Sequence, residues 1–186
     1  FGHDLHIDGD LVTTESGGLE LTVRGTGVLP RTFAGGAGDF GRLSKQAAEY
    51  IYAESEPALW STYLTNGSRY EEAIAFVKTR FSTAPREDRP YLLNSWGLAL
   101  EANGGSPREA LALYEAAIRL KPDFYTAWNN VQNSRIEFGD EEGAWRAGME
   151  MQRVAGGRPG RAPENNYGNW DWLTWNLKPW LAGIIF

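Results

Sequence analysis

Residues 93–122 read LNSWGLALEANGGSPREALALYEAAIRLKP, two apolar runs with helical spacing on either side of the break Asn103-Gly104-Gly105. Gly97 lies where two such helices would have to approach closely, because any larger side chain would hold their backbones apart. Pro122 ends the second run, since proline lacks an N–H and crowds the preceding turn. The stretch therefore predicts two helices joined by a turn and packed along one internal seam.

The same spacing recurs before and after this stretch. Ala73, Ala110 and Ala144 follow one another at intervals of 37 and 34 residues, and a proline follows each of the first two alanines after 12 residues. Trp60-Ser61 repeats Trp96-Gly97, so the two indoles are expected to fill equivalent seams. The third unit departs from the pattern at Gln132, Arg135 and Gly148, which replace a small, a large apolar and an aromatic residue.

This order of Trp, Leu, Gly, Tyr, Ala, aromatic residue and Pro resembles the tetratricopeptide repeat, whose period is about 34 residues. The resemblance implies a mainly α fold in which residues 57–156 form a short α-solenoid of about three repeats. Residues 1–56 are expected to form a small β-meander plus helix (α+β). Residues 157–186 are expected to form a linker and a Trp-rich C-terminal cap or docking tail.

Alternating polarity predicts the strands of the N-terminal segment. Leu19, Leu21 and Val23 alternate with polar residues, residues 11–14 favour extended backbone, and residues 31–34 suit a third strand. Two or three antiparallel strands are too few to be stable alone, so they must pack on a helix. That helix is predicted to start after Asp39 as its N-cap and to present one apolar stripe: Phe40, Leu43, Ala47, Tyr50 and Ile51.

Composition narrows the class of protein. The 186 residues carry a net charge of -6 and no cysteine, with a pI near 5.0 and a mean hydropathy of -0.44. A soluble globular protein without disulfides or thiol chemistry is expected, and its acidity argues against nucleic acid as a partner. The sequence begins with Phe1, so we expect an upstream segment to be missing; the compartment, cytoplasm or cell envelope, stays open.

In the tetratricopeptide family the first helix of each repeat lines a concave groove. The resemblance places these residues in that groove, with Asn130 beside them: Ala58, Thr62, Tyr91, Asn94, Leu98, Thr126, Asn129 and Asn133. The family's Lys/Arg clamp for a C-terminal carboxylate is not found at these positions. Asn129 and Asn133 lie four residues apart on one helix face, where their amides could bridge an extended peptide backbone. The alternative is that these amides are simply solvated.

Two interpretations of the tail remain open. It packs over the open end of the repeats, or Trp172, Trp175 and Trp180 protrude and dock to a partner or to a membrane–water interface.

Catalysis is not expected. His3, His6, Asp8 and Asp10 could hold a metal ion only on a regular strand, and we predict neither a metal site nor a cofactor. Glu71-Glu72 and Glu141-Glu142 suit helix starts, and no nucleotide-binding, hydrolase or metalloprotease motif occurs. The sequence thus favours a non-catalytic adaptor that binds another protein or a peptide. One alternative is a structural subunit of a larger assembly, including one at a membrane, docked through the tail; a second is a regulatory domain of a larger enzyme.

Overall fold

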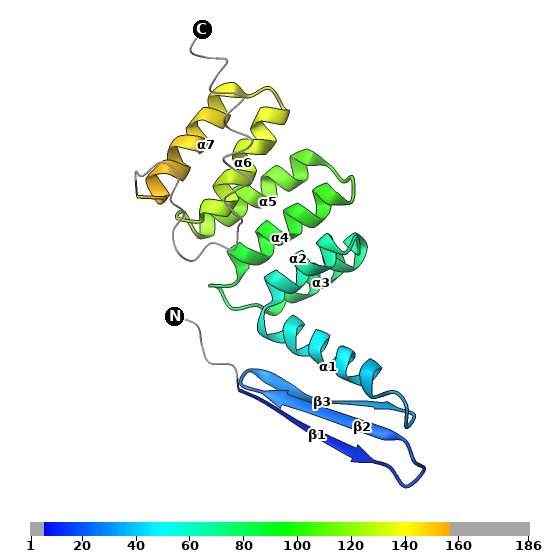
Figure 1. The fold of residues 1–186 in the computed structure, drawn as a ribbon. Coiled ribbons are helices and arrows are strands. Elements are labelled where there is room, and N and C mark those ends of the chain that lie inside the picture. Colours follow the sequence, from blue (N-terminus) through cyan, green and yellow to red (C-terminus); the bar gives the residue numbers. More distant parts are fainter. Residues whose placement is uncertain (1–5, 157–186) are drawn as a thin grey trace.

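The computed structural model describes residues 6–156. Within this range the protein is mainly helical, with a three-stranded antiparallel sheet followed by seven helices (Figure 1). The sheet consists of β1 (Ile7–Thr13), β2 (Leu19–Gly25) and β3 (Val28–Gly35), and the first helix is α1 (Phe40–Ser55). The predicted tail, with Trp172, Trp175 and Trp180, lies outside the described residues.

The sheet has the predicted meander topology, with β2 in the centre. Leu21 of β2 pairs with Leu11 of β1 and with Phe33 of β3. Helix α1 packs on β2 and β3, where the ring of Tyr50 meets that of Phe33 edge-on at 6.1 Å. The Tyr50 hydroxyl also donates a 2.9 Å hydrogen bond to the Leu29 carbonyl. Helix and sheet therefore stabilise one another, as so small a sheet requires.

Asp39 occupies the predicted N-cap position of α1, but the prediction that its side chain caps the helix is wrong. Asp39 does precede the helix, but its carboxylate accepts no hydrogen bond from the N–H groups of the first turn. It accepts instead from the Gly36 N–H at 2.9 Å and from the Arg42 guanidinium at 2.8 Å. The hydrogen bond from Arg42, followed by that from the Gly36 N–H in the turn between β3 and α1, lowers the pKa of Asp39.

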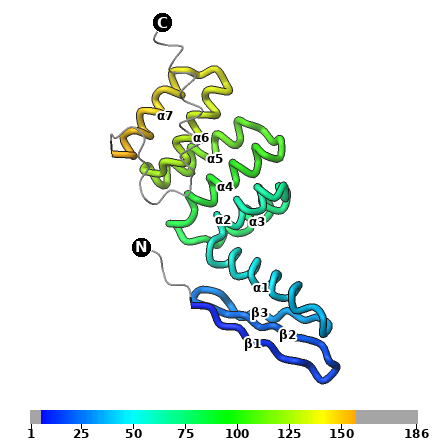
Figure 2. The backbone as a smooth tube through the Cα atoms, viewed as in Figure 1, coloured from blue at the N-terminus to red at the C-terminus, as the bar shows by residue number. Residues whose placement is uncertain are grey.

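Six helices follow in three consecutive pairs: α2 (Pro57–Asn66) with α3 (Tyr70–Thr83), α4 (Arg89–Ala102) with α5 (Pro107–Leu120), and α6 (Tyr125–Glu137) with α7 (Glu141–Val154). The members of each pair pack on one another, α4 also packs on α2 and α3, and α5 packs on α6. The pairs succeed one another away from the sheet (Figures 1 and 2).

The helices end where the prolines and glycines of the sequence predict. Helix α3 ends at Thr83, two residues before Pro85, and α5 ends at Leu120, two residues before Pro122. Between α4 and α5 the chain turns at Gly104, whose φ of 72° is a left-handed conformation that favours glycine.

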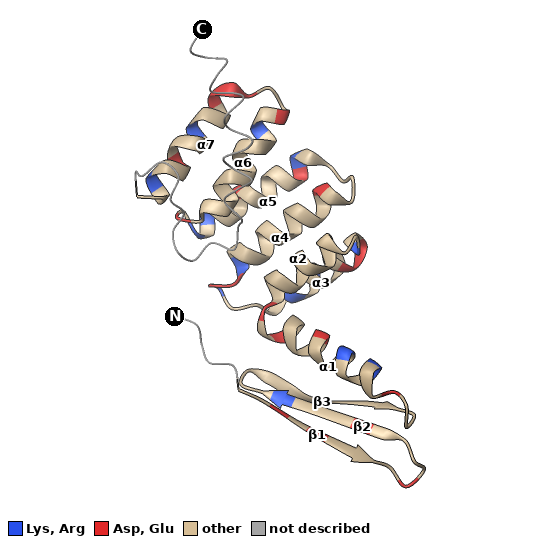
Figure 3. Cartoon of the chain, viewed as in Figure 1, with Lys and Arg blue, Asp and Glu red and all other residues tan. Residues whose placement is uncertain are grey.

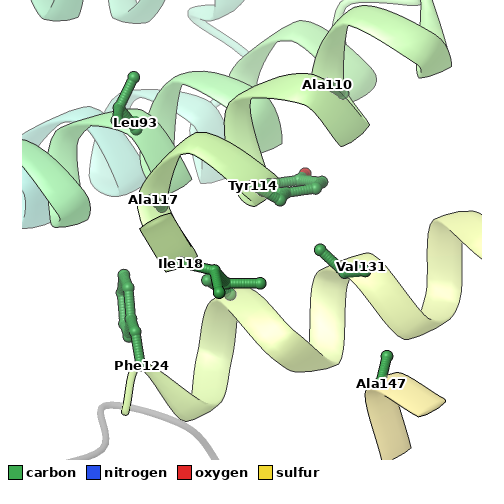
Figure 4. Close-up of a cluster of buried hydrophobic side chains, with 9 residues drawn as sticks. Leu93, Ala110, Tyr114, Ala117, Ile118, Phe124, Val131 and Ala147 are labelled. Atoms are coloured by element: carbon green, nitrogen blue, oxygen red, sulfur yellow. The ribbon is translucent and has the colours of Figure 1, made fainter. Parts of the chain in front are cut away.

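The seam within the α4–α5 pair is closed by a glycine against an aromatic ring. A Cβ added to Gly97 would lie less than 3.0 Å from three ring atoms of Tyr114, and the Tyr114 side chain is fully buried. Around it lie Ala110, Ala117 and Val131, in a cluster that joins α4, α5, α6 and α7 (Figure 4). The prediction that Gly97 allows a close helix approach is confirmed.

The departures in the third pair are accommodated in two ways. A Cβ added to Gly148 of α7 would lie 2.7 Å from Nε2 of Gln132 in α6, so a long side chain here faces a glycine. Arg135 replaces an apolar residue and instead donates hydrogen bonds to Glu115 of α5, at 2.9 Å, and to Asp140. Asp140 in turn caps α7 by accepting from the Gly143 N–H at 2.9 Å.

Trp60 and Trp96 occupy related but not identical surroundings. Each contacts the helix that precedes its own pair: Trp60 meets Tyr52 of α1 at 5.8 Å, and Trp96 lies beneath the Lys78 ammonium of α3 at 5.5 Å. Trp60 is only 6% exposed and stacks on Tyr63, whereas Trp96 is half-buried. The prediction that the two indoles fill equivalent seams is therefore wrong, since they differ in burial and in the cluster against which they pack.

Candidate functional site

The first helices of the three pairs are poor in charged residues. Helix α2 contains no charged residue, α4 carries only Arg89 and Glu101 near its ends, and α6 carries only Arg135 and Glu137 in its last turn. Helices α3, α5 and α7 each carry four or more charged residues, and the middle of α4 is drawn without charge in Figure 3. A ligand on the first helices would meet apolar groups and amides.

Two of the predicted binding residues bind one another instead. Asn94 of α4 is only 6% exposed, and its Oδ1 accepts a 2.9 Å hydrogen bond from Nδ2 of Asn130 in α6. This bond joins the first helices of two successive pairs. A buried amide needs such a partner, because an unpaired polar group in the interior is costly.

A second polar contact joins the same helices nearer their C-terminal ends. Glu101 of α4 accepts a 2.7 Å hydrogen bond from the Tyr114 hydroxyl and a weaker one, at 3.4 Å, from the Ser134 hydroxyl of α6. Burial raises the pKa of Glu101. Burial and the adjacent Glu101 carboxylate raise the pKa of Tyr114, so the phenol stays a hydrogen-bond donor. The Ser134 hydroxyl also reaches the Asn130 carbonyl of its own helix at 3.0 Å, so the Asn94–Asn130 bond is the stronger polar link between α4 and α6.

Asn129 and Asn133 differ from the bonded amides. Both lie on α6 and are half-buried, and neither side chain has a hydrogen-bond partner among residues 6–156. Their four-residue spacing places both side chains on one side of the helix. They are the predicted groove residues whose donors and acceptors remain available to a ligand.

The other predicted groove residues contribute mainly packing. Tyr91 is 41% exposed and its ring meets Phe124 edge-on at 4.9 Å. Leu98 packs against the cluster around Tyr114, and Ala58 against the cluster that contains Leu92. The remaining two are half-buried: Thr62 and Thr126.

The sequence analysis missed a second surface. A hollow of about 710 Å³ lies over α5, α6 and α7, and none of the predicted groove residues lines it. Its apolar lining includes Trp128 and Trp145, and Trp145 is 65% exposed. The charged Arg135–Glu115 pair lies along the same hollow. The one sequence signal for it was the departure of Arg135 from the repeat pattern, which by itself does not reveal a hollow.

Within residues 6–156 no three His, Asp or Glu side chains come together in a way that could hold a metal ion; His3 lies outside this range. Helices of the described part are too short or too polar to cross a bilayer.

Comparison with known proteins gives no family. No protein-family model matches the chain, and a search of curated proteins finds no match.

Proposed function

We propose that this protein is a non-catalytic interaction scaffold of the tetratricopeptide type, which holds an extended segment of a partner protein on the face of α2, α4 and α6. The observation that carries the proposal is the pair of half-buried amides of Asn129 and Asn133, which have no hydrogen-bond partner among residues 6–156, on a helix whose charged residues, Arg135 and Glu137, lie in its last turn. An amide offers both a donor and an acceptor, which suits a peptide backbone more than a charged group.

The packing between pairs supports the same proposal. In a repeat array each helix pair buries its apolar face against its neighbours. Here the cluster around Tyr114 draws on four successive helices, and the Asn94–Asn130 bond fixes α6 against α4. In this proposal Asn94 and Asn130 position the face, and Asn129 and Asn133 contact the partner.

The test is to replace both half-buried amides. A photoreactive residue placed at Asn129 or at Asn133 should capture the partner in cells, and the purified partner then serves for affinity measurements. Asn129→Ala with Asn133→Ala should weaken its binding by about five- to 150-fold, since two hydrogen bonds of about 0.5–1.5 kcal/mol each are lost. The melting temperature should change little, because neither amide is bonded within the described fold.

The hollow over α5–α7 provides the control. Trp145→Ala should leave binding to the α2–α4–α6 face unchanged. Unaltered affinity of the double asparagine variant would refute the proposal. Loss of binding in Trp145→Ala, with unaltered binding by the double asparagine variant, would place the partner at the hollow over α5–α7, where Trp145 and Met149 expose 65% and 47% of their surfaces.

A further inference from the structure

Among residues 6–156, strand β1 forms an edge of the sheet that no other strand covers. The strand order is β1-β2-β3, so β1 pairs on one side only, and all seven of its residues are exposed. No residue between 6 and 156 pairs with its outer side. In Figure 1 it lies on the side of the sheet away from α1. An unpaired edge is a ready template for another strand unless something blocks it.

The hydrogen-bond pattern identifies which groups of β1 point outward. The Thr14 N–H donates to the Gly18 carbonyl, and the Thr26 N–H donates to the carbonyl of His6. Because hydrogen-bonded pairs alternate along an antiparallel ladder, Asp8, Asp10 and Val12 also bond towards β2. The N–H and C=O groups of the other four residues therefore point away from the sheet: Ile7, Gly9, Leu11 and Thr13.

The side chains of β1 divide by face. Ile7 and Leu11 pair with Gly25 and Leu21, on the same side as the buried Val23, and remain 44% and 49% exposed. They extend the apolar face beyond the strands on which α1 packs, β2 and β3.

The opposite face of β1 is acidic. Asp8 and Asp10 expose 57% and 59% of their side chains there. Arg24 of β2 binds Asp10 at 2.6 Å, but Glu20 adds a third carboxylate to this face, so negative charge remains in excess.

These charges indicate which kind of strand could be added. The antiparallel register that joins all seven residues of two β1 strands places Asp10 opposite Asp10, and the register centred on Gly9 places Asp8 opposite Asp10. Like charges directly opposite are unfavourable, so these two registers disfavour a second copy of this edge, whereas the register centred on Leu11 places Asp10 opposite Val12 and does not. The other edge, β3, carries Pro30, which has no N–H and is typical of protected edges.

We infer that β1 accepts an added strand from a partner segment in which basic and apolar residues alternate. The basic side chains lie against Asp8 and Asp10, the apolar ones against Ile7 and Leu11, and the main chain bonds to the four outward-facing residues. This surface is separate from the face of α2, α4 and α6 and does not depend on the function proposed for it.

The probe is a capped heptapeptide of alternating valine and lysine, added to the full chain and followed by amide hydrogen exchange. Binding should slow exchange at Ile7, Gly9, Leu11 and Thr13, and a valine–glutamate heptapeptide should have no such effect. Protection confined to other acidic regions, or none, would overturn the inference. Protection that grows with protein concentration in the absence of peptide would show that a second copy occupies the edge, and would equally overturn it.

Matched variants separate strand addition from general charge attraction. Leu11→Pro removes one outward N–H and should weaken peptide binding at least tenfold, whereas Leu11→Ala keeps the N–H and should weaken it less than about threefold. Asp8→Asn with Asp10→Asn leaves the backbone intact and should weaken binding by about two- to thirtyfold, since each lost charge pair accounts for about 1.4- to fivefold. Equal binding by the proline and alanine variants contradicts the inference. If Leu11→Pro disrupts the hairpin, the double variant Asp8→Asn with Asp10→Asn serves as the test. Unchanged peptide binding by that double variant would also contradict the inference.

Discussion

The α4–α5 and α6–α7 pairs close the same kind of seam with opposite residues. In α4–α5 the glycine, Gly97, is on the first helix and the large residue, Tyr114, on the second; in α6–α7 the large residue is Gln132 on the first helix and Gly148 is on the second. Interiors are close-packed, so what matters is that a large group meets a small one. The comparison teaches that a seam constrains the combined volume across it more than the residue type at each position.

The largest expected effect is the loss of the buried ring. Tyr114→Ala should destabilise the protein by about 3–5 kcal/mol, because it leaves a cavity in a site with no exposure and also removes the hydrogen bond to Glu101. Gln132→Ala in the other seam should cost about 1 kcal/mol or less, since Gln132 is half-buried. Urea denaturation measures both, and similar losses would mean that the two seams are equally well packed.

Adding one methyl group to each glycine probes the seams from the other side. Gly97→Ala should destabilise by about 1–2 kcal/mol, because crowding against the fixed Tyr114 ring outweighs the better helix propensity of alanine. Gly148→Ala should be neutral or stabilise by up to about 1 kcal/mol, because the end of the flexible Gln132 side chain can move aside. Thermal unfolding of the two variants gives the signs, and a stabilising Gly97→Ala would contradict this description.

The first pair extends the comparison to a third seam. Ser61 of α2 stands where α4 has Gly97 in the repeat alignment. It is fully buried, and its hydroxyl has no hydrogen-bond partner among the described residues. Ser61→Ala should therefore stabilise the protein by about 1 kcal/mol, since it removes an unsatisfied polar group from the interior. A loss of stability in denaturant titration would show that the hydroxyl has a partner.

The smallest expected effect is a pH dependence specific to the α4–α5 seam. Burial raises the pKa of Glu101 above its ordinary value of 4.5, so the folded state holds this proton more tightly than the unfolded chain does. The resulting stabilisation is complete below pH 4.5 and is lost as pH rises through the folded-state pKa. The stability of the wild type relative to Glu101→Gln should therefore fall with rising pH. Paired urea titrations across this range measure it, and a difference that does not change with pH would contradict the assignment.

Much of the fold could be predicted from local signals, and less of the site. Alternating apolar residues indicated the strands, and apolar residues at spacings of three and four indicated the helices. Pro85, Pro122 and the Asn103-Gly104-Gly105 break located helix ends. The interpretation of Asn94 as a ligand contact did not anticipate its bond to Asn130, because the two are 36 residues apart in the sequence. The role of Asp39 likewise depended on Arg42 and the turn before the helix. The resemblance to tetratricopeptide repeats remains a prediction.

The sequence by itself determined the order of strands and helices, several helix ends and which faces are apolar, because periodicity, proline and glycine act on the nearest turn of chain. The strand bounds were predicted too short, since β1 begins at Ile7 and β3 at Val28. Only the tertiary structure decided which polar groups are already paired, that Gly148 compensates for Gln132, and that β1 is left with one open side. Those outcomes depend on distances between residues far apart in the chain, which no local pattern contains.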